Sequence, residues 1–344
     1  MKKPVLVVKF GSSSLTNLKG EIDERVVLEI ARQISMLQKE YNVVIVSSGA
    51  VAAGKRQLEK YSGSLVERKA AAAIGNPLLI RTYGQYFRPF KIEIAQSLCE
   101  RQHFANRDQF LQLKGTYEEL WKNNIIPIAN ENDVVSNKEL KFSDNDELAT
   151  MIAVGFGAEK LLLNTSVGGV LDADNQVIRE IELIDKAILS LVRDEVSTSG
   201  LGGMTSKLNF ARLATKLGVE VTIFNMQEEN SIIKAVKGKV GTVCKVRRSK
   251  LKARSNWLAT GSLISGLVRV DNGAKIALQK RNSLLAVGVT DVPHEFEAGE
   301  VFHIADASGD VFAVAKSKLD FGKAQCAMKE KNVEVANASD IVLL

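Results

Sequence analysis

The order of apolar and polar positions changes character near residue 245. Before that point, continuous apolar runs alternate with segments whose apolar residues recur at helical spacing. The runs predict strands at 4–10, 42–48, 91–99, 124–130, 159–166 and 219–225. The helical spacing predicts helices at 21–41, 66–87, 106–123, 145–157 and 204–217. Gly75 and Pro77 are expected to bend or divide the second helix. Apolar strands separated by helices predict a parallel sheet that is covered on both faces.

Beyond residue 245 the pattern is one of short alternating strands separated by Gly and Asp turns. The segments are "GSLISGLVRVDNGAKIAL", "NSLLAVGVTD", "GEVFHIAD" and "GDVFAVAKS". They predict a small all-β domain of roughly 80–90 residues. We therefore expect a first domain at 1–245, a linker at 246–257 and a second domain at 258–344.

The composition fits a soluble globular protein. The chain has 344 residues, 45% hydrophobic and 25% charged, which is enough for two domains. No apolar run reaches the roughly 18 residues of a membrane helix. The start "MKKPVLVVKF" is interrupted by Lys9 too early for a signal peptide. These features predict a cytoplasmic protein without a membrane segment.

Cysteine, histidine and charge patterns add little chemistry. Cys99, Cys244 and Cys326 lie far apart without CxxC spacing, and the three histidines show no metal-ligand spacing. We therefore expect reduced thiols and neither a disulfide framework nor a zinc site. The stretch 231–270 contains ten Lys or Arg and no acid. It fits either a solvated linker or a polyanion-binding surface.

Polar clusters follow several of the predicted strands. They are "KFGSSSLTN" from Lys9, "SSGA" from Ser47, "NENDVV" from Asn130 and "NTSVGG" from Asn164. A parallel sheet binds ligands at the carboxyl ends of its strands. The first cluster taken alone fits either a turn or a phosphate-binding loop.

The segment "GAVAAGKR" matches GxxxxGK but is not expected to be a P-loop. A P-loop needs Ser or Thr where Arg56 stands, and no apolar strand here ends in the aspartate that accompanies such a loop. We expect an Ala-rich helix that packs on the sheet.

Two other segments carry stronger chemical signals. "SGLGGMTSKL" places a Gly-rich turn before a helix, with Lys207 in its first turn. A cation there opposes the helix dipole, which indicates a lysine aimed at an anion. "FSDNDELAT" offers Asp144, Asn145 and Asp146 at the start of another helix, more than capping requires. Carboxylates beside two lysines are typical of phosphoryl transfer.

Taken together, these segments resemble the glutamate 5-kinases of the amino acid kinase family, with a PUA domain at the C-terminal side. The matching segments are "VVKFGSSSLT", "IVSSGAVAAG", "PIANENDVV", "SDNDELA", "SGLGGMTSKL" and "VDNGAKIAL". They occur in the family's order over essentially the whole chain.

The resemblance implies a three-layer αβα sandwich with a mostly parallel sheet, followed by a small all-β PUA barrel. It implies transfer of the ATP γ-phosphate to the side-chain carboxylate of L-glutamate, giving L-glutamyl 5-phosphate, the first step of proline biosynthesis. It further implies Mg²⁺, a homo-oligomer (dimer or tetramer) and proline as a feedback inhibitor.

The resemblance also assigns roles by motif. Lys9 and Lys207 stabilise the transferred phosphate, and Asp146 organises them. Glutamate contacts are expected at Ser48, Asp133 and Asn145, with Asp133 for the α-ammonium and the other two as neutral donors to carboxylates. The expected ATP-binding residues are Lys9, Gly11, Thr165, Ser166, Leu201, Gly202, Gly203, Met204, Thr205, Ser206 and Lys207. No protein metal ligand is expected.

One departure and three alternatives stay open at this point. Thr165-Ser166 stands where the family usually has Thr-Asp, which leaves the nucleotide contacts undefined. A related kinase could act on another acidic amino acid or on a carbamate. An RNA-binding role through the PUA domain fits the basic linker but lacks an aromatic stacking set. Lys9, Asp146 and Lys207 argue against a sensor without catalysis.

Overall fold

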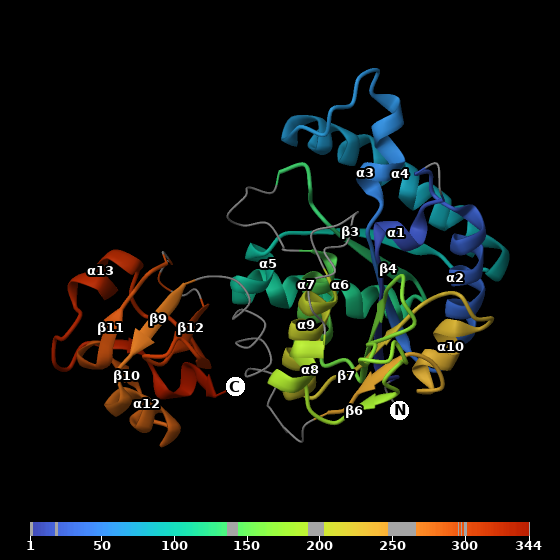
Figure 1. Cartoon of the computed structure of the whole chain (residues 1–344). Helices are drawn as coiled ribbons and strands as arrows, with labels where there is room; N and C mark the ends of the chain where they lie inside the picture. Colours follow the sequence, from blue (N-terminus) through green and yellow to red (C-terminus); the bar gives the residue numbers. More distant parts are fainter. Residues whose placement is uncertain are drawn as a thin grey trace. The chain divides into compact units, whose positions relative to one another are not determined.

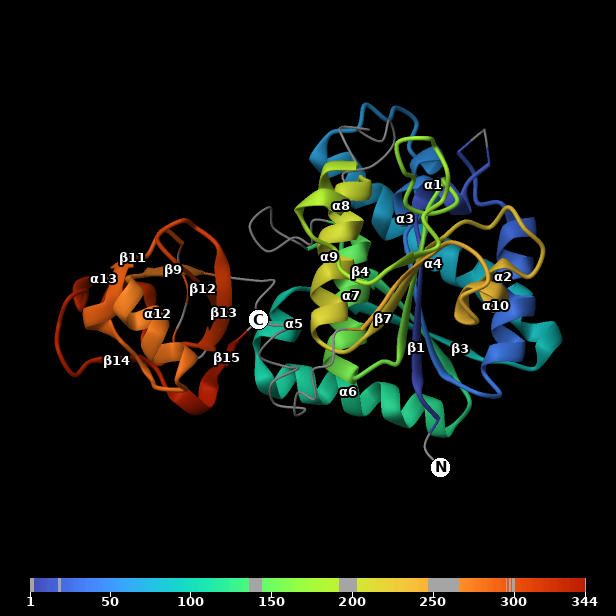
Figure 2. The same ribbon diagram turned by 60° about the horizontal axis from the view of Figure 1, so that its bottom comes forward.

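The computed structural model describes residues 3–17, 20–135, 144–191, 203–246, 266–294, 296, 298 and 301–343. The chain divides into two compact units (Figures 1 and 2). One comprises residues 1–100 and 114–249, and the other comprises 101–113 and 250–344. Among the described residues, no helix combines the length and the apolar character needed to span a bilayer.

The first unit is built on an eight-stranded sheet. Its strands, in spatial order, are β3 (Ile94–Cys99), β4 (Ile126–Glu131), β2 (Asn42–Ser47), β1 (Val5–Phe10), β5 (Lys160–Asn164), β7 (Glu220–Phe224), β8 (Thr242–Cys244) and β6 (Glu180–Ile181). Only the β7–β8 pair is antiparallel within this sheet. The mostly parallel sheet is therefore confirmed, and all six predicted strands belong to it. The two short strands β6 and β8 were not predicted.

Helices cover both faces of this sheet (Figure 1). The helices described before residue 246 are, in chain order, α1 (Ser12–Leu15), α2 (Glu24–Leu37), α3 (Ala50–Gly54), α4 (Leu65–Phe87), α5 (Gln102–Ala105), α6 (Arg107–Lys122), α7 (Asn145–Phe156), α8 (Lys186–Leu191), α9 (Met204–Lys216) and α10 (Ser231–Val236). Of these, α5 and the start of α6 belong to the segment 101–113 that is grouped with the second unit. Apolar residues of α2, α4 and α10 share one core with alternate residues of β1. Helix α7 packs against β1 and β5, and α9 packs against β7. Because strand side chains alternate between faces, this arrangement gives three layers.

Helix α4 runs unbroken past Pro77, so of the two expected effects the division of this helix does not occur. A capping box closes its start: Ser64 accepts from the Glu67 N–H, and Glu67 accepts from the Ser64 N–H. Helix α3 packs closely against α4. A Cβ atom at Gly75 would lie 1.7 Å from the carbonyl oxygen of Ala50. The P-loop-like segment thus forms a short helix, as predicted, but this helix packs mainly on α4 and not on the sheet.

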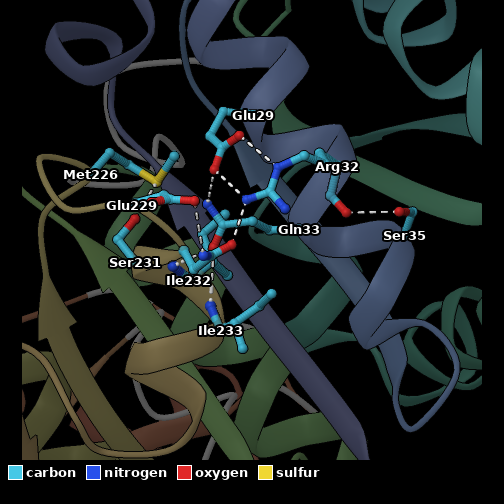
Figure 3. A network of polar contacts seen from close by, with 10 residues as sticks. Glu29, Arg32, Gln33, Ser35, Met226, Glu229, Ser231, Ile232 and Ile233 are labelled. Carbon is cyan, nitrogen blue, oxygen red and sulfur yellow. Dashed lines mark hydrogen bonds and ion pairs between the residues drawn. The ribbon is translucent and has the colours of Figure 1, made fainter.

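A buried glutamine joins α2 to the start of α10 (Figure 3). Gln33 is fully buried, and its Oε1 accepts from the backbone N–H groups of Ile232 and Ile233 at 2.8 and 3.1 Å. The residue before α10, Asn230, has left-handed backbone angles and no capping side-chain bond. Gln33 therefore satisfies the first N–H groups of α10 in place of a local cap.

The second unit contains a five-stranded sheet. The strand order is β11 (Val289–Asp291), β9 (Leu267–Val270), β12 (Val301–Ala305), β13 (Val311–Lys316) and β15 (Ile341–Leu343). A two-stranded sheet pairs β10 (Leu284–Leu285) with β14 (Glu334–Ala336). The short strands are confirmed, and two helices join them: α12 (Asn272–Gln279) and α13 (Phe321–Cys326).

Helix α12 corrects one prediction. The segment "DNGAKIAL" was expected among the strands, but it forms a helix that Asp271 caps by accepting from the Ala274 N–H at 2.7 Å. An Asp cap followed by Ala and Leu favours a helix locally, and this local preference prevails. The predicted linker at 246–257 lies almost wholly outside the described residues.

Candidate active site

Lys9 is the second-last residue of the apolar strand β1. Leu6, Val8 and Phe10 face the core shared with α2, α4 and α10. Lys9 stands between two of them, so alternation turns its side chain to the other face, where α7 packs on β1. Gly11 is the first residue after β1, and a Cβ there would lie 3.5 Å from the Lys9 Nζ. The strand end therefore brings an ammonium group and an open stretch of backbone to one place.

Asp146 lies between two lysines. Its Oδ1 is 2.6 Å from the Nζ of Lys9, and its Oδ2 is 2.9 Å from the Nζ of Lys207. The three residues are 0%, 5% and 8% exposed, respectively. These ammonium groups are the ion-pair partners of the two carboxylate oxygens. The sequence placed the three residues on three elements, and the fold brings them together.

The charge state of Asp146 follows from this arrangement. Burial alone would raise the pKa of its carboxyl group. The ammonium groups of Lys9 and Lys207 outweigh burial and hold that pKa below its ordinary value. Asp146 is therefore a carboxylate at neutral pH. One negative charge between two positive charges leaves the side chains of Lys9, Asp146 and Lys207 with a net positive charge. A net positive charge favours the binding of an anion.

Asp144 joins the starts of α7 and α9. Its Oδ1 accepts from the N–H groups of Asp146 and Glu147 at 2.8 and 3.1 Å, as a helix cap does. Its Oδ2 accepts from the Ser206 hydroxyl at 3.2 Å. Burial and the nearby charge of Asp146 raise the pKa of Asp144. Asp144 thus links the two helices whose first turns carry Asp146 and Lys207.

A chain of amides runs beside this charged cluster. The Nδ2 of Asn145 donates to the Ser48 Oγ at 2.7 Å and to the Asn130 Oδ1 at 3.0 Å. The Nδ2 of Asn130 in turn donates to the Asn76 Oδ1 at 3.1 Å. Two of the residues expected to contact glutamate, Ser48 and Asn145, are therefore hydrogen-bonded to each other. However, both N–H groups of Asn145 are already engaged, so this arrangement does not support its expected role as a donor to a carboxylate.

A second contact from α4 supports the end of β2. Ser47 is fully buried, and its hydroxyl lies 2.9 Å from the Tyr83 hydroxyl. Burial raises the pKa of Tyr83, so this phenol stays neutral. Asn76 and Tyr83 are seven residues apart on α4, which places them on the same face of the helix. One helix face therefore supports the ends of both β2 and β4.

The remaining predicted residues follow other strands of the sheet, lie at the start of α9 or fall outside the described residues. Asp133 is half-buried in the turn after β4. Thr165 follows β5 and donates its N–H to the Phe224 carbonyl at 2.8 Å, while Ser166 is exposed. Gly203 precedes α9 without a capping side chain. Met204 and Thr205 begin that helix, and Leu201 and Gly202 lie outside the described residues.

Sequence reasoning missed Asn76 and assigned no role to Asn130. Asn130 belongs to the noted cluster "NENDVV", so a signal existed for it. Asn76 gave only a weak signal, a polar residue inside an otherwise apolar helical stretch. Its function depends on the packing of α4 beside β4, which a local pattern does not reveal.

Comparison with known proteins agrees with this geometry. The amino acid kinase family matches residues 4–225, and the PUA domain matches residues 266–338. The chain is 37% identical to a glutamate 5-kinase of Kosmotoga olearia, covering 93% of this chain and 89% of that protein. It is 38% identical to glutamate 5-kinase 1 of Bacillus licheniformis, covering 90% and 88%.

Solved structures give a likeness in fold alone. A carbamate kinase from Giardia lamblia bound to AMP-PNP superposes with a TM-score of 0.53 at 21% identity, covering 71% of this chain and 99% of that chain. The family match and the similarity to curated relatives over nine tenths of the sequence carry more weight. The chain therefore belongs to the amino acid kinase family, where it groups with the glutamate 5-kinases and carries a PUA domain at residues 266–338.

Proposed function

We propose that the protein transfers the γ-phosphoryl group of ATP to the side-chain carboxylate of L-glutamate. The product is L-glutamyl 5-phosphate, and the reaction is the first step of proline biosynthesis. The observation that carries this proposal is the buried Lys9–Asp146–Lys207 cluster at the carboxyl edge of the sheet. The names of the curated relatives support the choice of glutamate.

The chemistry needs charge stabilisation more than proton transfer. A carboxylate oxygen of glutamate attacks the γ-phosphorus while the bond to the β,γ-bridging oxygen breaks, and ADP leaves. A glutamate side chain has an ordinary pKa of about 4.3, so it is already ionised at neutral pH. No general base is therefore required. The two lysines offset the negative charge that the carboxylate and the phosphate bring together.

Asp146 acts in this scheme as an organiser of the lysines. Its carboxylate fixes the Nζ atoms of Lys9 and Lys207 on either side of it. Fixed cations need little rearrangement when charge shifts during the transfer, which is the source of electrostatic catalysis. The low pKa of Asp146 keeps this arrangement intact throughout the neutral range.

Substrate contacts follow from the neighbouring strand ends. We assign the amino acid to the side of Ser48, Asp133 and Asn145, at the ends of β2 and β4 and the start of α7. We assign the nucleotide to the side of Gly11, Thr165 and Ser166 and to the stretch 201–207 that leads into α9. The lysine cluster stands at the start of α7 and α9, where the two substrates would meet.

Mg²⁺ enters this proposal with ATP. Among the described residues, no group of three or more His, Cys, Asp or Glu side chains is placed to hold a metal ion. Asp146 is engaged by two lysines, and Asp144 by two N–H groups and a hydroxyl. Mg²⁺ in kinases is held largely by substrate phosphates and water. We therefore treat MgATP as the substrate.

Other expectations stay predictions. They are a homo-oligomer, feedback inhibition by proline, a cytoplasmic location, and an undefined ligand for the PUA domain. Each can be tested on the purified protein or in cells without reference to the catalytic site.

An ADP-release assay tests the proposed function. The protein is offered ATP and Mg²⁺ with glutamate, aspartate, N-acetylglutamate or carbamate, and hydroxylamine traps any acyl phosphate. We expect glutamate to give much the highest kcat/KM and to yield the hydroxamate. Preferential turnover of another acceptor would assign the chain to a related kinase activity instead.

A further inference from the structure

The amide chain of Asn76, Asn130 and Asn145 leaves two buried polar atoms without a partner among the described residues. They are the Nδ2 of Asn76 and the Oδ1 of Asn145. A buried polar atom without a hydrogen bond is costly and rare in folded proteins. Asn145 stands beside Ser48 at the edge of the sheet where the amino acid is proposed to bind. Its unpaired oxygen therefore suggests a partner that arrives with the substrate.

A backbone N–H group fixes the direction in which the hydrogen bonds run along the three asparagine side chains. The N–H of Glu131 donates to the Asn130 side chain at 2.9 Å. A backbone N–H can only donate, so the atom of Asn130 that faces it is the amide oxygen. The nitrogen of Asn130 then faces Asn76, and Asn76 answers with its oxygen at 3.1 Å. No other assignment of the amide oxygen and nitrogen of Asn130 satisfies both contacts.

The same polarity extends to Asn145. The Asn130 oxygen also accepts from Asn145, so Asn145 turns its nitrogen toward Asn130 and Ser48. What remains is an acceptor on Asn145 and the hydroxyl hydrogen of Ser48, which can donate. An acceptor suits an ammonium group, and a hydroxyl donor suits a carboxylate. Glutamate carries both groups at its α-carbon.

We propose that Asn76, acting through Asn130, holds the Asn145 amide with its oxygen toward the α-ammonium group of the amino acid substrate. This inference rests on the proposed function and deepens it. Asn76 is a positioning residue, 4% exposed and carried by a long helix. Without its oxygen, the nitrogen of Asn130 loses its partner and the orientation of both amides is less strongly fixed.

The first test replaces Asn76 with leucine, which has a similar size and no acceptor. We expect the glutamate KM to rise by about 3- to 10-fold, the effect of one neutral hydrogen bond, while kcat and the ATP KM change less than about twofold. Glutarate has both carboxylates and no ammonium. Its inhibition constant against glutamate should therefore stay near the wild-type value. An equal rise for glutamate and glutarate would overturn the proposal.

Two further variants separate positioning from general damage. Trp121→Phe removes the hydrogen bond from the indole N–H to the Val43 carbonyl, at the other end of β2, and should leave the glutamate KM unchanged. Asn76→Ala removes the same acceptor and serves if the leucine variant does not fold. Thermal unfolding of each variant shows that the kinetic comparison concerns folded protein.

A double-mutant cycle shows whether Asn76 acts through Asn145. If it does, Asn145→Ala should largely abolish the effect of Asn76→Leu on the glutamate KM. Additive effects would mean that Asn76 does not position Asn145. If the wild type prefers another amino acid, the proposed function fails separately. The cycle is then measured with that amino acid and its analogue lacking the ammonium.

Discussion

At the scale of single residues, the site depends on the Asp146 carboxyl group, whose pKa lies below its ordinary value. Asp146 is fully buried, and its two carboxylate oxygens form ion pairs with the ammonium groups of Lys9 and Lys207. A lysine in the first turn of α9 opposes the helix dipole, and the carboxylate of Asp146 compensates for it. The unfavourable placement of Lys207 is thus explained by its partner on α7. We propose that it concentrates positive charge where the phosphate is transferred.

The lysines should be needed for turnover more than for binding. We expect Lys9→Ala or Lys207→Ala to lower kcat by roughly 10²–10³-fold, the scale for one preorganised electrostatic group. Steady-state kinetics with glutamate and ATP would measure this. Lys160→Ala is the control, because Lys160 forms an ion pair with Glu220 at the other end of the sheet strands. A folded Lys9 or Lys207 variant with wild-type kcat would remove that lysine from the mechanism.

Replacing Asp146 with asparagine should destabilise the protein, because two buried lysines lose their partner. The expected loss is roughly 3–5 kcal/mol in the free energy of unfolding, the range for breaking a buried ion pair. The folded pKa of Asp146 is depressed, so its contribution is present above the ordinary pKa near 3.8 and is lost as pH falls through the lower, folded value.

Urea unfolding of wild type and Asp146→Asn between pH 7 and pH 4 checks this sign. The difference between the two proteins should stay constant over most of that range. A difference that shrinks steadily between pH 7 and pH 5 would show that the carboxyl group titrates above its ordinary pKa.

Ser166 stands where the family resemblance predicts an aspartate. It is exposed after β5 and lacks the carboxylate expected there. Ser166→Asp should lower the ATP KM or sharpen the preference for ATP over other nucleoside triphosphates, because a carboxylate accepts hydrogen bonds from ribose hydroxyls or an amine. The glutamate KM should hardly move. A variant that changes only the glutamate KM would place this strand end on the amino acid side.

At the scale of elements, α4 supports the strand ends that carry the candidate site. It carries Asn76 and Tyr83 on one face, and these contact the ends of β4 and β2. Its position is set by the close backbone approach of α3 at Gly75. Neighbouring helices α2 and α10 are joined by Gln33 in a comparable way (Figure 3).

Gly75→Ala should therefore be disruptive, since the new Cβ atom would lie 1.7 Å from the Ala50 carbonyl oxygen. We expect a loss of at least 1–3 kcal/mol in the free energy of unfolding, on the scale of an overpacked core. Gly84→Ala, on the same helix, is the matched control. Its Cβ would meet nothing closer than 4.0 Å, so helix propensity should stabilise it by up to about 1 kcal/mol. Equal effects of the two changes on chemical denaturation would contradict the packing argument.

At the scale of the whole molecule, the site belongs to the first compact unit. The described candidate residues run from Lys9 to Lys207, and the PUA match begins at residue 266. Each unit also has a hydrophobic core of its own. We therefore propose that catalysis belongs to the first unit.

A chain that ends near residue 250 should still phosphorylate glutamate, with a glutamate KM within a few-fold of the full-length value. Glutamyl hydroxamate formation and circular dichroism on the same preparation would test this. A folded but inactive truncated chain would show that the C-terminal domain contributes groups to catalysis. The assignment of catalysis to the first unit alone would then be wrong.

The sequence by itself determined the six main strands, the five long helices before residue 246 and the candidate chemistry. Continuous apolar runs identified all six main strands, because strands buried on both faces have few polar positions. Lys9, Asp146 and Lys207 were identified because each breaks a local expectation or matches a family segment. The tertiary structure alone decided which residues meet: Asp144 with Ser206, Gln33 with α10, and Asn76 with Asn130. These contacts join residues 54 to 200 positions apart, and no local periodicity encodes such pairings.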